Sequence, residues 1–163
     1  MGYRDAVVCT ADHLFVFAFR VTPANVSDKV QLIPTLSPLE TEGMLKYVGA
    51  LWGDNAFCTT GNREWMVDKH VADHLHTADE TGKDRKNRRS ARRKSKIRSR
   101  IEALFGILRE NTVFQRSRVR TLPRVTIEQA LIFTAHNLFG LIALIDGRFE
   151  DHLSMRRFLW TLK

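Results

Sequence analysis

The stretch RDAVVCTADHLFVFAFRV, residues 4–21, sets the fold class of this chain. Residues 4–10 and 14–21 form two short, mainly apolar segments, and Ala11-Asp12-His13 between them is typical of a turn. The stretch therefore predicts two strands joined as a hairpin. Nearly every position of the second strand is apolar, so we expect both of its faces to be covered by other elements.

Downstream of the hairpin, short helical and strand-like segments follow one another. Ser27 or Asp28 is suited to cap a short helix, and Ser37-Pro38-Leu39-Glu40 has capping-box spacing with proline at the first helical position, which predicts a helix start there. Residues 47–53 (YVGALWG) predict a third, buried strand. Asn62 is expected to cap a short helix after it, and residues 71–76 are a weak strand candidate.

Two longer helices are predicted in the last third of the chain. Between Ser95 and Asn111 the apolar residues follow helical spacing, namely Ile97, Ile101, Leu104, Phe105 and Leu108. A capping pair, Thr126 with Gln129, opens a second helix that ends at Asp146-Gly147. Within it we expect His136 and Asn137 to be polar core residues with satisfied hydrogen bonds. Strands alternating with helices predict an α/β fold with a mixed sheet. One domain is expected over residues 1–147, followed by a tail from 148 to 163.

Positive charge is concentrated in one segment of the chain. The 163 residues include 26 Lys and Arg and 18 Asp and Glu, for a net charge of +8, and 44% are apolar, which is ample for one core. Residues 83–100 read KDRKNRRSARRKSKIRSR, with eleven basic residues and one acidic residue, so they hold the whole excess. Such clustering is typical of a protein that meets a phosphate backbone, and the plain alternative is a solvated basic arm.

The sequence also indicates a compartment. Cys9 and Cys58 are too few for a disulfide framework, and no basic segment followed by an apolar stretch opens the chain. We therefore expect a cytoplasmic protein, associated with the nucleoid through its basic segment. The longest apolar stretch, residues 130–145, contains polar interruptions and is shorter than a bilayer span, so it predicts a buried helix and no membrane partner.

Two carboxylates are placed for chemistry on a nucleic acid. Asp54 directly follows the third predicted strand, at the edge where open α/β sheets collect their ligands. Glu102 lies on the first long helix, with Arg98 one turn before it and Arg109 two turns after it on the same face. Carboxylates bind hard cations such as Mg²⁺, and two such ions about 4 Å apart catalyse in-line displacement at phosphorus. Taken singly, an Asp after a strand is most often a turn or cap residue, and such a Glu is usually solvated.

Five sequence blocks, in order, resemble the DDE-type transposases of bacterial and archaeal insertion sequences. They are Gly2-Tyr3-Arg4, VTPANVSD at 21–28, WGDNAF at 52–57, SKIRSRIEALFGILR at 95–109 and Asn137-Leu138. The resemblance extends from Gly2 to about Ile145. It implies a ribonuclease H-like catalytic domain, in which helices flank a mixed sheet. It also implies an enzyme that uses Mg²⁺ or Mn²⁺ to cleave DNA and transfer strands during DNA transposition.

The resemblance assigns roles to residues. Asp54 matches the second catalytic aspartate and Glu102 the catalytic glutamate, both as metal ligands. Arg98 matches the arginine before the glutamate, Arg109 stands where the family often has lysine, and Ser95 stands where many members have tyrosine. Contacts with DNA, at transposon ends and target, are expected from Arg92, Arg93, Lys94, Lys96, Arg98, Arg100 and Arg109. A homodimer is the expected protein assembly.

The family's first catalytic aspartate has no counterpart in the sequence. In the family it lies on the opening strand, upstream of the Gly-Tyr-Lys/Arg block, which here directly follows Met1. Asp5 falls inside the first predicted strand and Asp12 in its turn, so neither matches that position. The fold is expected to lack this central first strand, which exposes sheet edges. We hypothesise a truncated or split copy, inactive alone, whose partner is an upstream-encoded fragment carrying the first aspartate.

Two other interpretations stay open. A non-catalytic DNA-binding remnant would keep the basic segment, residues 83–100, and lose the chemistry. A decayed gene product would not fold stably at all. A further feature, the Asp73, His74 and His76 group, suggests a metal site but needs two more ligands that the sequence does not offer, so we expect a solvated strand there.

Overall fold

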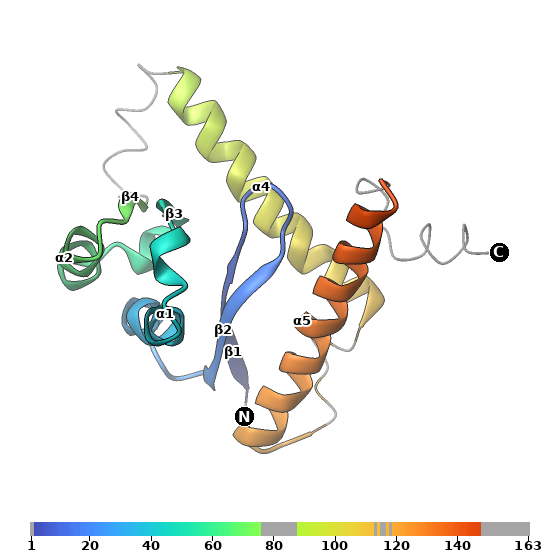
Figure 1. Ribbon diagram of the computed structural model, residues 1–163. Coiled ribbons are helices and arrows are strands. Elements are labelled where there is room, and N and C mark those ends of the chain that lie inside the picture. The colour runs from blue at the N-terminus through green and yellow to red at the C-terminus, as the bar shows by residue number, and fades with distance from the viewer. Residues whose placement is uncertain (1, 76–87, 113, 115–116, 118, 148–163) are drawn as a thin grey trace. The chain divides into compact units, whose positions relative to one another are not determined.

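The computed structural model describes residues 2–75, 88–112, 114, 117 and 119–147. The chain divides into two compact units (Figure 1). The first unit comprises residues 1–8 and 18–99, and the second comprises residues 9–17 and 100–163. The single domain over residues 1–147 stays a prediction, and the tail expected from 148 to 163 lies outside the described residues.

The predicted hairpin is present. Its strands are β1 (Tyr3–Cys9) and β2 (Val16–Pro23). They pair in a two-stranded sheet, with backbone hydrogen bonds of 2.9 Å from Thr10 to Phe15 at one end and from Ala24 to Gly2 at the other. A pairing that joins the start of one strand to the end of the next is antiparallel. The tip of the hairpin, residues 9–17, belongs to the second unit.

The first helix of the first unit begins earlier than the sequence indicated. The short 3₁₀ helix Asp28–Val30 is capped by Ser27 as predicted, but α1 (Leu32–Thr41) runs through Pro38 instead of starting there. Pro38 has no N–H to offer the carbonyl of Pro34, and the hydroxyl of Ser37 donates to that carbonyl at 3.3 Å. The predicted helix start at Ser37 was therefore wrong. The Ser37 hydroxyl instead bonds the carbonyl that Pro38 leaves without a donor inside the helix.

The third and fourth strands form a separate parallel pair. They are β3 (Ala50–Gly53) and β4 (Ala72–Leu75), linked through α2 (Thr60–Asp68). Trp52 lies opposite His74 in the register. Thr59, not Asn62, caps α2. The buried Asn62 amide instead donates to the carbonyls of Lys29 and Phe57, at 3.2 and 2.7 Å, and so joins α2 to the 3₁₀ helices Asp28–Val30 and Asn55–Phe57.

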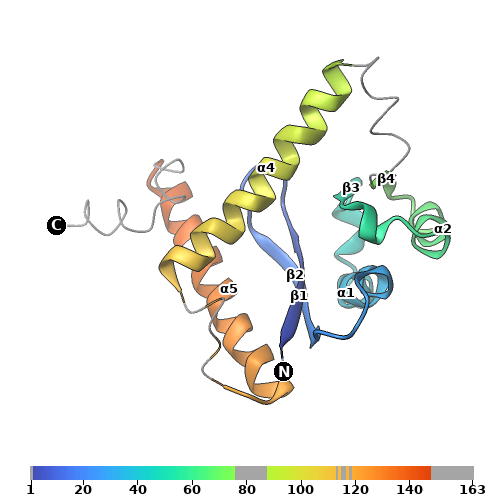
Figure 2. The same cartoon turned by 180° about the vertical axis from the view of Figure 1, so that it is seen from behind.

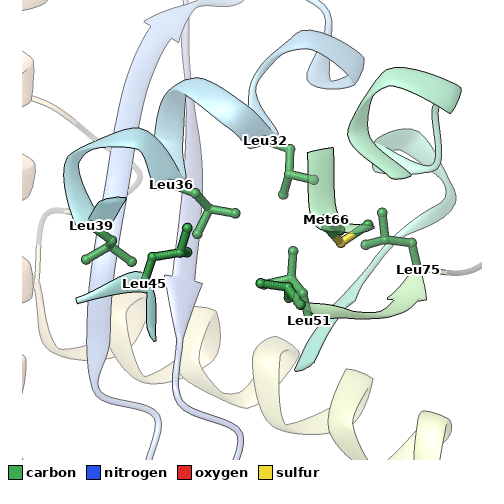
Figure 3. Close-up of a cluster of buried hydrophobic side chains, with 8 residues drawn as sticks. Leu32, Leu36, Leu39, Leu45, Leu51, Met66 and Leu75 are labelled. Atoms are coloured by element: carbon green, nitrogen blue, oxygen red, sulfur yellow. The ribbon is translucent and has the colours of Figure 1, made fainter. Parts of the chain in front are cut away.

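The α/β fold class is confirmed, but the described strands form two two-stranded sheets and not one mixed sheet. Both sheets contribute to the same core in the first unit (Figure 3). The buried members of this cluster are Leu32, Leu36, Leu39, Leu45, Leu51, Met66, Val71 and Leu75. Val8 of β1 and Ala18 of β2 pack against it. The two sheets therefore share one hydrophobic core although no described strand bridges them.

The second unit is built on two long helices, α4 (Arg88–Asn111), which begins in the first unit, and α5 (Leu122–Ile145). Both begin ahead of the predicted starts, and Thr126 donates to the carbonyl of Leu122 inside α5 instead of capping it. Leu104 and Leu108 are buried as predicted, and Ile107 is buried too. Ring contacts join α4 to α5, from Phe105 to Phe114 at 5.8 Å and from Phe114 to Phe133 at 5.9 Å.

Two adjacent polar residues attach α5 to the hairpin tip, as predicted for satisfied core residues. The amide of Asn137 accepts from the N–H of Val16 and donates to its carbonyl, both at 2.8 Å. His136 is 2% exposed, and its Nε2 lies 3.0 Å from the carbonyl of Leu14. Burial lowers the pKa of His136, and since a carbonyl can only accept, Nε2 carries the proton. Asn137 thus pairs with both backbone groups of Val16, at the start of β2, as a residue of a neighbouring strand would.

By length and composition alone, α5 would also suffice to cross a membrane, with 33% of its most apolar window buried inside the protein. Its polar residues His136 and Asn137 bond to backbone in the same unit, which is the behaviour of a core helix. The absence of a membrane partner stays a prediction.

Candidate active site

Asp54 directly follows β3, where the sequence placed it. Its carboxylate accepts from the N–H of Asn55 at 2.7 Å and thereby caps the 3₁₀ helix Asn55–Phe57. The side chain is exposed. Asp54 is therefore both a cap residue, the plain alternative, and an accessible carboxylate at the carboxyl end of a parallel strand pair. These two roles are compatible, since a carboxylate accepts several hydrogen bonds or metal bonds at once.

The residue before it fixes where this carboxylate lies. A Cβ atom at Gly53 would come within 2.6 Å of Cδ2 of Leu75 on β4. Leu75 is 3% exposed and belongs to the core cluster, so it fills the space that a side chain at position 53 would need. The end of β3 therefore lies close against the Leu75 side chain of β4, and Asp54 follows directly after this close contact.

Of the group Asp73, His74 and His76, the structure describes the first two, both on the neighbouring strand β4. Asp73 forms an ion pair with Arg63 at 3.2 Å and accepts from the N–H of Leu75 at 2.8 Å. His74 is exposed and stacks on Trp52, with ring centroids 4.9 Å apart. His76 lies outside the described residues. Within the described part of the chain, no three His, Cys, Asp or Glu residues gather in a group that could hold a metal ion.

Glu102 lies on the exposed side of α4. The helix buries Leu104 and Leu108 on its other side, so its own packing turns Glu102 outward. Arg109, two turns on, is exposed as well, which agrees with the predicted shared face. Asp54 belongs to the first unit and Glu102 to the second, so the structure characterises each carboxylate within its own unit.

The expected DNA-contacting residues fall into two groups. Arg92, Arg93, Lys94, Lys96 and Arg98 lie on the helical backbone of α4, and their side chains are outside the described part of the structure. Arg100 has a partner within the protein that the sequence did not reveal. Its guanidinium donates to the carbonyl of Ala11 at 2.6 Å and lies 3.3 Å from the carboxylate of Asp12. Arg100 therefore ties α4 to the hairpin turn, and its DNA contact stays a prediction.

Asp5 is a half-buried acid on β1 that does not match the family's first aspartate. Its Oδ1 is buried and has no hydrogen-bond partner among the described residues. Burial raises the pKa of Asp5 from 3.8 to about 6. Burial disfavours the charged carboxylate, so the folded chain takes up a proton at a higher pH than the unfolded chain does.

We expect Asp5→Asn to stabilise the chain at neutral pH. Because the pKa is raised in the folded state, stability is lost as the pH rises from about 4 to about 6, by about 1 to 2 kcal/mol, since solvent screens the part of the group that is exposed. The asparagine variant should lack this loss. Urea unfolding between pH 4 and pH 7 measures the difference between variant and wild type.

Asp68→Asn is the matched control for this measurement. Asp68 is exposed, and Lys69 lowers its pKa, so its substitution should not reproduce the gain at neutral pH. Parallel stability profiles for wild type and Asp5→Asn would show that burial does not perturb Asp5.

Comparison with known proteins identifies the family of this chain. Residues 1–138 match the family described as Transposase DDE domain. No curated protein and no solved structure matches the chain. The match covers most of the sequence, including Asp54, Glu102 and Arg109. This chain therefore belongs to the transposase DDE domain family.

Proposed function

We propose that this chain is one part of a DDE transposase that cleaves DNA and transfers strands in DNA transposition, with its first aspartate supplied by an upstream-encoded strand. Family membership over residues 1–138 carries the proposal. Asp54 at the end of β3 and Glu102 on the exposed side of α4 support it, since both are accessible carboxylates. We propose that the chain alone is inactive.

The sheet arrangement of the first unit favours a further strand. β1 pairs with β2, and β3 pairs with β4, so among the described residues β1 and β3 each keep an unpaired edge. Both sheets pack on the same core cluster. In the proposed ribonuclease H-like arrangement, the upstream strand lies between β1 and β3 and joins them into one mixed sheet. Unpaired edges are otherwise costly, because their N–H and carbonyl groups invite aggregation.

DDE transposase domains use divalent metals, and the donor set here suits one. Asp54 and Glu102 offer the hard oxygen ligands that Mg²⁺ or Mn²⁺ prefers, and the upstream aspartate would complete the set. Bound metal would supply Lewis-acid stabilisation at phosphorus and activate the attacking hydroxyl. The chain's own part is to place Asp54 at the end of β3 and to turn Glu102 outward on α4.

The basic segment is the proposed DNA contact. Its arginines and lysines would neutralise phosphates at transposon ends and target, together with Arg109 on the exposed side of α4. We propose a cytoplasmic, nucleoid-associated homodimer. The alternative, a non-catalytic DNA-binding remnant, is favoured by the same segment, which requires neither carboxylate.

The deciding experiment is reconstitution. The nucleotides upstream of the Met1 codon are first read for an apolar strand that ends in aspartate, in this frame or a shifted one. That fragment is then co-expressed with the chain, and nicking of supercoiled plasmid is measured in Mg²⁺ or Mn²⁺. We expect activity from the pair and none from either part. Nicking by the chain alone, or no such upstream strand, would contradict the split enzyme and leave the DNA-binding alternative.

A further inference from the structure

Side chains from both long helices hold the hairpin tip, residues 9–17. From α4, Nη1 of Arg100 donates to the carbonyl of Ala11 at 2.6 Å and lies 3.4 Å from the carbonyl and 3.3 Å from the carboxylate of Asp12. From α5, His136 and Asn137 bond to backbone groups later in the tip. Figures 1 and 2 show the bend of the hairpin beside the middle of α4. All of these contacts lie within the second unit.

The backbone of the tip is fixed by its own hydrogen bonds. Leu14 has a φ of 56°, in the left-handed region that is unfavourable for a residue with a Cβ atom. Its N–H donates to the carbonyl of Thr10 at 3.2 Å, and its own carbonyl bonds to His136. The hydroxyl of Thr10 also accepts from the N–H of Phe15 at 3.0 Å. Strained backbone persists where its surroundings determine it, so the tip offers the Ala11 carbonyl as a fixed acceptor.

Arg100 is the first residue of α4 that belongs to the second unit. Four and eight residues further on, Leu104 and Leu108 are 0% and 1% exposed, so Arg100 adds one turn to the packed side of α4. Glu102 lies between these turns and faces away from them, exposed. The direction in which Glu102 points is therefore set by Arg100 before it and by Leu104 after it.

We propose that Arg100 is a positioning residue, which holds the turn of α4 that carries Glu102 against the hairpin tip. A hydrogen bond donated by a charged guanidinium is about twice as strong as a neutral one. The Asp12 side chain is 85% exposed, and exposed ion pairs contribute little, so the carbonyl of Ala11 is the main acceptor. The inference rests on the proposed role of Glu102 as a metal ligand. It gives Arg100 a role other than the phosphate contact expected from the sequence.

Amide hydrogen exchange of the full chain, without DNA or metal, tests the contact itself. Arg100→Ala should speed exchange of the N–H groups of Leu14, Phe15 and Glu102 at least about 10-fold, because the bond from a charged donor is lost. Arg124→Ala is the control, since Arg124 is exposed on α5 in the same unit and its loss removes the same charge. If Arg100→Ala does not melt cooperatively, Arg100→Gln replaces it. Unchanged exchange rates would overturn the proposal.

Metal dependence of nicking by the reconstituted pair tests the position of Glu102. Arg100→Ala should raise the Mg²⁺ concentration at half-maximal nicking about 10- to 100-fold, as expected when a group that supports a metal ligand is lost. Excess Mg²⁺ should restore most of the rate. Thr10→Val changes no charge but removes the hydroxyl that bonds Phe15, so it should shift the Mg²⁺ requirement in the same direction. Arg92→Ala should instead weaken DNA binding and leave the Mg²⁺ requirement unchanged.

The two measurements separate a positioning role from a DNA contact and from failure of the proposed function. Weaker DNA binding by Arg100→Ala, with an unchanged Mg²⁺ requirement, would assign Arg100 to DNA and overturn the positioning role. An unchanged requirement in both Arg100→Ala and Thr10→Val would overturn it too. No nicking by the wild-type pair would contradict the proposed function. The exchange rates would then still confirm or overturn the hold of the hairpin tip on α4, since they require neither DNA nor metal.

Discussion

Replacing Asp54 by asparagine should reduce metal-dependent nicking by the reconstituted enzyme at least about 100-fold. Loss of a group that merely supports a metal ligand costs 10- to 100-fold in activity, and Asp54 is proposed as a ligand itself. The substitution is clean in structural terms. The asparagine oxygen still accepts from the N–H of Asn55, and asparagine caps helices as well as aspartate does. The variant removes the charge and leaves the cap.

Glu102→Gln should have a loss of the same size, and a matched control is available on the same helix. Glu110 is also exposed on α4 but is not a proposed ligand, so Glu110→Gln should keep full nicking activity. Nicking rates at several Mg²⁺ concentrations, with unfolding curves for each variant, provide the measurement. Full activity in both Asp54→Asn and Glu102→Gln would remove these residues from the active site.

Neutralising Arg92, Arg93 and Lys94 should weaken DNA binding by this chain and make it less sensitive to salt. Each neutralised phosphate contributes about 0.9 to the slope of log affinity against log salt, so three lost contacts lower the slope by about 2.7. Between about 50 and about 200 mM salt, this corresponds to about a 40-fold smaller loss of affinity than in the wild type. Fluorescence anisotropy with a short duplex measures both slopes.

The control removes the same charge elsewhere. Arg20, Lys29 and Lys46 are exposed basic residues outside the segment, and their replacement by alanine should leave the slope almost unchanged. Equal effects in the two triple variants would mean that net charge alone attracts DNA. Arg100→Ala is a separate case, because this guanidinium also holds Ala11 and Asp12 of the hairpin turn.

The elements of this fold were predictable because each leaves a local pattern. The hairpin, the strand before Asp54 and the buried stripe of α4 follow from apolar spacing, which reports burial directly. Helix starts were less predictable. Ser37-Pro38 has capping-box spacing, yet α1 runs through it, since burial of Leu32 and Leu36 favours an earlier start. Tertiary packing thus outweighs a capping signal of about 1 kcal/mol.

The site was predictable only in part. Asp54 and Glu102 could be named from their positions after a strand and on a helix face. Two contacts could not be predicted from the sequence, because they join residues that are far apart in the chain. Arg100 reads as one more basic residue of its segment, but its partner is a turn 88 residues away. Likewise, Gly53 is a needed glycine only because Leu75 fills its side-chain space.

The sequence by itself determined the α/β class, the two carboxylates and the location of the basic charge, because spacing and composition are properties of neighbouring residues. Only the tertiary structure decided how α5 is used. Its sequence is apolar on all sides, which local pattern alone cannot divide into an inner and an outer face. The bonds of His136 and Asn137 to the hairpin tip select the inner face. The opposite side of α5, which carries Ile127, Leu138 and Ile145, is exposed in the described part of the chain.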